Sequence, residues 1–87
     1  MLRDIIQLTI MKLQIITPTG INSNSNVNRF QFTSANGMME FLPGHAPMIA
    51  EIKKGFIHTE ADDIACGNGV VKINDDTITV VCETTKQ

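Results

Sequence analysis

Apolar and polar residues alternate along most of this chain. Phe30 and Phe32 stand two positions apart, and Ile78, Val80 and Cys82 recur at every second position. A period of two places successive side chains on opposite faces, so each run predicts a half-buried strand with its apolar residues toward a core. No stretch of helical length keeps a 3.6-residue period. The pattern therefore predicts an all-β protein.

Turn signals divide this pattern into short strands. Asn36-Gly37 is a strong hairpin signal, and Asn74-Asp75-Asp76 joins the last two strands. The Asn/Ser run at 22–26 predicts a loop or a weakly paired edge strand, and Gly67-Asn68-Gly69 predicts a bulge or turn. The other expected strands cover residues 12–17, 28–33, 38–42, 48–52, 55–60, 64–66, 70–73 and 77–83. The spacing predicts a small β-sandwich or flattened barrel of about eight to ten short strands.

The most distinctive turn is Pro43-Gly44-His45-Ala46-Pro47. Pro43 fixes its φ near −65° and Gly44 can adopt a positive φ, which together suit a type II turn. Pro47 has no N–H to donate and fits the first residue of the next strand. This corner either shapes the sheet or presents His45 and its neighbours to a partner.

Length and composition limit the classes of function. A chain of 87 residues makes one domain that leaves much of its surface exposed, so a partner surface would add stability. The net charge is −2, with four Phe and neither Trp nor Tyr. A basic field for phosphates and an aromatic platform for bases are both missing, so nucleic-acid binding is not expected.

Residues 1–11 form an N-terminal extension or contain an alternative start at Met11, in which case residues 1–10 lie upstream of the protein. This segment is too short to span a membrane, and Asp4 interrupts its apolar run, so it fits a signal peptide poorly. The β-sandwich domain is expected to cover residues 12–85, with 86–87 as a tail.

The chain carries little that predicts catalysis. Nucleophile-elbow, phosphate-loop and dinucleotide motifs are absent. Cys66 and Cys82 are expected to be buried free thiols, and with two histidines they lack zinc spacing. A catalytic pair of His45 with one cysteine is the enzyme alternative, although a turn residue is the preferred interpretation. No catalytic, cofactor or metal residues are predicted, and a binding module is the natural inference.

Four stretches, in order, resemble the N-terminal β-sandwich domain of the epsilon subunit of the F-type ATP synthase. They are the opening strand at 12–18, the segment from Gly37 through P-G-H-A-P to Ile49, the stop at 52–57, and the closing hairpin at 67–84. The resemblance covers nearly all of residues 12–85, and the P-G-H-A-P element is uncommon.

This resemblance implies a non-catalytic rotor component of the central stalk. It would bind the gamma subunit and the c-ring, act on the alpha–beta hexamer indirectly, and couple ion translocation to ATP synthesis. The coupling ion, proton or sodium, would be set by the ring. The expected location is peripheral, on the cytoplasmic face of the bacterial inner membrane. A free-standing β-sandwich binding module, for instance a small-ligand carrier, is the alternative.

The resemblance also assigns interface residues toward gamma and the c-ring: Thr17, Met38, Glu40, Pro43, Gly44, His45, Ala46 and Pro47. Many relatives carry a carboxylate at the position of Met38. Glu40 lies two residues on and would point to the same face of a strand, so it is the candidate substitute. Met38, Glu40 and the corner with His45 are expected at the end nearest the ring and gamma. Relatives usually continue into a two-helix domain that restrains ATP hydrolysis and in some cases binds ATP, and a natural chain of 87 residues would lack both.

Overall fold

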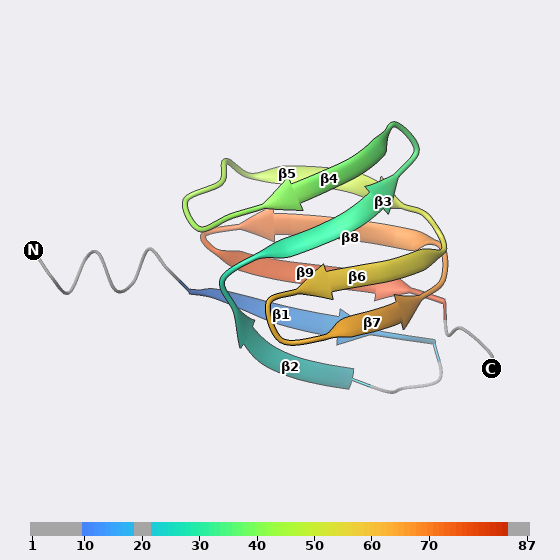
Figure 1. Ribbon diagram of the computed structural model, residues 1–87, viewed down its shortest axis with the longest axis horizontal. Helices are drawn as coiled ribbons and strands as arrows, with labels where there is room; N and C mark the ends of the chain where they lie inside the picture. The colour runs from blue at the N-terminus through green and yellow to red at the C-terminus, as the bar shows by residue number, and fades with distance from the viewer. Residues whose placement is uncertain (1–9, 19–21, 84–87) are drawn as a thin grey trace, which may run out of the picture.

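The computed structural model describes residues 10–18 and 22–83, and all regular elements in these ranges are strands (Figure 1). Their bounds are β1 (Met11–Ile16), β2 (Asn22–Val27), β3 (Phe30–Ser34), β4 (Gly37–Phe41), β5 (Met48–Ile52), β6 (Gly55–Thr59), β7 (Asp63–Cys66), β8 (Gly69–Asn74) and β9 (Thr77–Cys82). The all-β prediction is confirmed, and the Asn/Ser run is a true strand. Most of the predicted N-terminal extension and the predicted tail lie outside the described residues.

The strands form one curled sheet with the order β2-β1-β9-β8-β5-β3-β6-β7, and β4 pairs with the other edge of β3. The pairing of β1 with β9 is parallel and the remaining pairs are antiparallel. Along one edge, β3 pairs with β6 at Phe30 and Gln31 and with β5 only at Ser34. The sheet folds over at this change of neighbour, and β3, β6 and β7 lie over β8, β9 and β1 in Figure 1.

The core fills the space between these two halves. Phe30, Phe32 and Phe41 pack against one another with ring centroids 5.3 to 5.8 Å apart. Both halves contribute alternate residues, as the period-two pattern predicts. The buried apolar side chains are Met11, Leu13, Ile15, Val27, Phe30, Phe32, Phe41, Ile52, Ile57, Cys66, Val71, Ile73, Ile78, Val80 and Cys82.

The register defines two ends of the molecule. At one, which we name the hairpin end, Ser34 lies opposite Ile52, Ile52 opposite Gly69, and Gly69 opposite Cys82. At the other, which we name the corner end, the proline corner and the β8–β9 turn flank the start of β1. The corner end is on the left in Figure 1 and the hairpin end on the right. Among the described residues, no helix has the length and apolar character needed to cross a membrane.

Candidate docking surfaces

The proline corner is a type II turn. Gly44 has φ of 86°, and the N–H of His45 donates to the carbonyl oxygen of Leu42 at 3.1 Å. Pro43 and Gly44 therefore occupy the two central positions that the sequence predicts for them. Pro47 comes directly before β5, one residue earlier than the strand itself.

Asp76 fastens this corner to the rest of the sheet. The backbone N–H of Gly44 donates to Oδ1 of Asp76 at 2.7 Å, and the N–H of Lys12 donates to the Asp76 carbonyl oxygen at 2.8 Å. Asp75 and Asp76 have φ of 51° and 58°, the left-handed pair of a type I′ turn, and this turn aims the carboxylate at the corner. Sequence reasoning treated both residues only as a hairpin tip, because a contact over 32 residues has no local signal.

His45 is a half-buried side chain held by its own loop. Its ring lies 4.8 Å from the ring of Phe41, centroid to centroid, and its Nδ1 lies 2.7 Å from the carbonyl oxygen of Ala46. Cys66 and Cys82 are at the hairpin end, separated from the corner by the length of β9, roughly 17 Å. The catalytic pair of His45 with a cysteine is therefore not formed.

Met38 and Glu40 share the exposed face of β4. They lie opposite Thr33 and Gln31, at alternate positions of the strand, so the predicted common orientation is present. The Glu40 carboxylate accepts a hydrogen bond from Gln31 at 3.2 Å and lies 3.8 Å from Nε of Arg29. The Glu40 carboxylate therefore already has a hydrogen-bond partner and a nearby guanidinium within this chain.

The structure separates the predicted interface residues into two groups. Met38, which is 59% exposed, stands at the hairpin end, and Thr17 follows β1 at the same end. His45 and the proline corner are at the far end of β4. Met38 and His45 therefore lie at the two ends of β4, and the interface role of each stays a prediction.

A patch of exposed apolar side chains, the outer apolar patch, consists of Ile49, Val70 and Val81. Their exposed fractions are 69%, 48% and 51%. Val70 lies directly opposite Val81, and Ile49 is its diagonal neighbour on β5. Sequence reasoning did not single out these residues. The sequence does carry a signal for them, namely adjacent apolar pairs such as Val70-Val71 within a strand. Only one member of each pair can face the core, so the other member must be exposed on the outer face.

An open groove of about 360 Å³ joins this patch to the corner. It is lined by Pro47, Met48, Ile49, Lys72, Ile73 and Asn74. Pro47 belongs to the corner and Ile49 to the outer apolar patch, so the two features form one continuous surface on β5 and β8.

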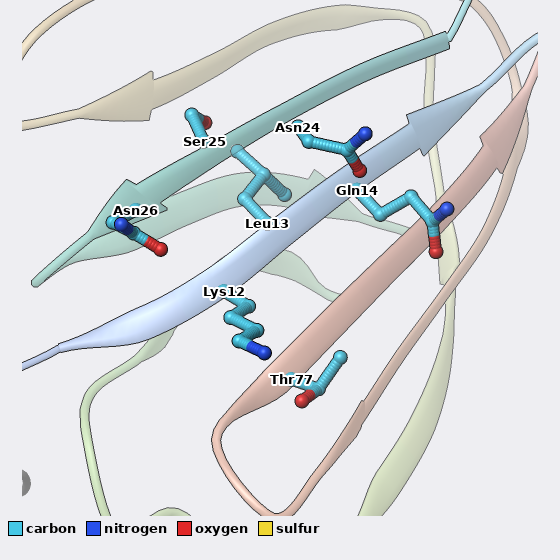
Figure 2. A pocket seen from close by; sticks show the side chains of 7 residues that line it. All are labelled: Lys12, Leu13, Gln14, Asn24, Ser25, Asn26 and Thr77. Carbon is cyan, nitrogen blue, oxygen red and sulfur yellow. The ribbon is translucent and has the colours of Figure 1, made fainter.

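A second groove, of about 420 Å³, runs over β2, β1 and β9 (Figure 2). It is lined by Lys12, Leu13, Gln14, Asn24, Ser25, Asn26 and Thr77. In register, Lys12 lies between Asn26 and Thr77, and Gln14 lies beside Asn24. The lining has amide and hydroxyl groups with a single charge, the Lys12 ammonium. This arrangement offers hydrogen bonds but no acid–base pair.

The described ranges contain no group of three His, Cys, Asp or Glu side chains placed to hold a metal ion. What they contain is a fixed turn joined to an exposed apolar surface. Such features are typical of a small β-domain with a binding role rather than a catalytic one. The chain belongs to the delta/epsilon family of ATP synthase subunits, because the family model "ATP synthase, Delta/Epsilon chain, beta-sandwich domain" matches residues 10–87.

A solved relative supports the same fold. A chain in the cryo-EM structure of the Tetrahymena thermophila mitochondrial ATP synthase, central stalk and c-ring, superimposes with a TM-score of 0.72. The identity is 13%, and the alignment covers 85% of this chain and 63% of that chain. At this identity the likeness concerns the fold.

Proposed function

We propose that this chain is a non-catalytic rotor component of the ATP synthase central stalk that binds the gamma subunit and the c-ring. It would pass rotation between them and so couple ion translocation to ATP synthesis. It would be peripheral to the membrane through the complex, in a bacterium on the cytoplasmic face. The observation that carries the proposal, given the family, is the continuous surface formed by the proline corner and the outer apolar patch.

This surface suits the shaft subunit gamma. Ile49 and Val70 expose apolar area that burial against a partner would stabilise at about 25 cal/mol per Å² before association costs. The corner beside them is held by proline geometry and by Asp76, so little conformational entropy would be lost on docking.

The hairpin end suits the polar loops of the ring. Met38 is exposed there and its flexible thioether can adapt to an uneven surface. Lys53 and Lys54 are exposed nearby, and no ion pair of theirs occurs among the described residues. Their ammonium groups would favour acidic side chains on the partner. Two separate contact surfaces, one on the corner and the outer apolar patch and one around Met38 and the two lysines, would let one small domain join two partners.

The proposed contact between the outer apolar patch and gamma can be tested by measuring how well variants of the patch capture purified gamma. Ile49→Asp and Val70→Asp place a charge in the patch, and Phe56→Asp makes the same kind of change at a side chain that is 54% exposed on β6. We expect the two patch variants to weaken capture of purified gamma at least tenfold, whereas Phe56→Asp leaves it within twofold. Equal losses in all three variants, or none in the patch variants, would refute this assignment.

The corner and the ring contact need separate assays. The double variant Pro43→Ala/His45→Ala is expected to reduce co-purification with gamma, and Lys53→Glu/Lys54→Glu is expected to reduce co-purification with the c-ring while gamma capture persists. Unchanged assembly and ion pumping with the corner variant would mean that the corner is not interfacial. A wild-type chain that captures neither partner would favour the free-standing binding module.

A further inference from the structure

The two cysteines lie at the same end of the molecule although their strands are not neighbours. Cys66 is the last residue of β7 and Cys82 the last residue of β9, and four strands separate β7 from β9 in the sheet order. Both arrowheads point to the hairpin end in Figure 1. The thiols are free, and the residues are only 2% and 4% exposed. The short Gly67-Asn68 connection leads from β7 into β8, and Gly69 at the start of β8 lies opposite Cys82, so the two cysteines come to the same end of the core.

Backbone contacts directly after each cysteine hold the two strand ends together. The N–H of Gly67 donates to the carbonyl oxygen of Glu83 at 3.0 Å, and the N–H of Glu83 donates to the carbonyl oxygen of Asn68 at 3.0 Å. A Cβ on Gly67 would stand 2.9 Å from Cβ of Glu83, so a residue without a side chain is needed for this approach. The residues that follow Cys66 and Cys82 are therefore in direct contact.

Burial of the two side chains also affects their acidity. Burial, and then the neighbouring Cys82 thiol, raise the pKa of Cys66 to about 11. Burial likewise raises the pKa of Cys82. Both sulfurs are thus protonated near neutral pH.

We propose that Cys66 and Cys82 are a reversible redox pair that forms an intramolecular disulfide with a disulfide oxidant such as oxidised glutathione. One thiolate attacks the oxidant, forms a mixed disulfide and releases a glutathione thiolate. The second thiolate then attacks the protein sulfur of that mixed disulfide and releases the second glutathione. Two S–H bonds are lost, one S–S bond forms, and the two electrons and two protons leave with two molecules of reduced glutathione.

The bond would change the mechanics of the sheet. β7 is the last strand of the order and pairs with β6 alone among the described strands. A covalent link to β9 would tie this edge to the middle of the opposite half. Because the thiols are buried and protonated, oxidation should be slow and should need transient opening of the hairpin end.

Oxidation of the whole chain under native conditions tests the pair. The protein is incubated with oxidised glutathione, and free thiols, intact mass and the thermal midpoint are measured before and after dithiothreitol. We expect loss of both thiols together, a mass change of two hydrogens without glutathione, and a midpoint higher by about 10 °C that dithiothreitol reverses. Cys66→Ala and Cys82→Ala are the matched controls, and each should yield only a glutathione adduct on the remaining thiol.

A second experiment covers the case in which the hairpin end opens too slowly for oxidation of the native protein. The chain is oxidised in urea, where the cysteines are accessible, and then diluted into buffer. A monomeric disulfide form that regains the native circular dichroism and the raised midpoint supports the pair. Glutathione adducts on both cysteines, disulfide-linked dimers as the main product, or an oxidised monomer that cannot refold would each overturn it.

Discussion

The backbone N–H of Gly44 donates a hydrogen bond of 2.7 Å to the carboxylate of Asp76, a residue 32 positions later in the chain. The bond joins the proline corner to the β8–β9 turn. In the same turn, the carbonyl oxygen of Asp76 accepts a hydrogen bond from the N–H of Lys12 at the start of β1. Three distant segments thereby share one anchor, and the exposed corner has a defined position relative to the outer apolar patch.

Removal of the Asp76 carboxylate should loosen the corner. Asp76→Ala loses a hydrogen bond to a charged acceptor and places alanine at a positive φ, so we expect a loss of about 2 kcal/mol in the free energy of unfolding, measured with urea. Asp75→Ala is the matched control because it carries the same φ cost without the bond to Gly44, and it should lose about 1 kcal/mol. Equal losses in the two variants would mean that the hydrogen bond contributes nothing to stability.

The Gly44 position should be limited by backbone conformation rather than by space. A Cβ placed there meets nothing within 4 Å, but φ is 86°. Gly44→Ala should therefore cost about 1–2 kcal/mol of stability, and Gly44→Asn less, because asparagine tolerates the left-handed region. Urea unfolding of the two variants checks the ranking. If asparagine proved as costly as alanine, φ would not be the cause.

Substitution of Gly69, in contrast, should be limited by space rather than by backbone conformation. A Cβ there would collide with the carbonyl oxygen of Val81 and would lie 2.6 Å from Cα of Cys82, with no positive φ involved. Gly69→Ala should destabilise the fold by about 3 kcal/mol, because two paired strands would have to separate. Thermal unfolding of purified protein measures this loss. A midpoint within a few degrees of the wild type would contradict the close approach of β8 to β9.

Stability should fall at alkaline pH through Cys66. Its pKa is about 11 in the folded state against an ordinary value of 9.0, so the unfolded chain loses this proton first as pH rises. Between pH 9 and 11 the unfolded state binds fewer protons, and the free energy of unfolding should decrease by at most about 1.4 kcal/mol per pH unit from this thiol. Below pH 9 the thiol should have no effect.

Urea titrations at pH 7 to 10.5, with a phosphine reductant present, measure this slope. Cys66→Ala retains the lysines and the other titrating groups, so the difference between the variant and the wild type isolates the thiol. Equal pH slopes in the two proteins would show that the Cys66 thiol is not desolvated in the native state.

Local patterns were sufficient for most of the secondary structure. Alternation around Phe30 and Phe32 predicted a strand with both rings buried, and both are buried. Asn36-Gly37 predicted the β3–β4 hairpin, and Pro43-Gly44 predicted the type II turn. The Asn/Ser run was left open between a loop and an edge strand. It pairs with β1 along its whole length, because strand pairing can override a weak local preference.

The sequence by itself determined the all-β class, the family resemblance and the conformation of the corner. These depend on side-chain periodicity and on φ preferences, which act within a few residues. The tertiary structure alone decided that Asp76 holds Gly44 and that the strand ends carrying Cys66 and Cys82 lie side by side. The first depends on the pairing of β5 with β8, which places the corner beside the β8–β9 turn, and the second on the pairing of β8 with β9. No local pattern encodes contacts made over such chain separations.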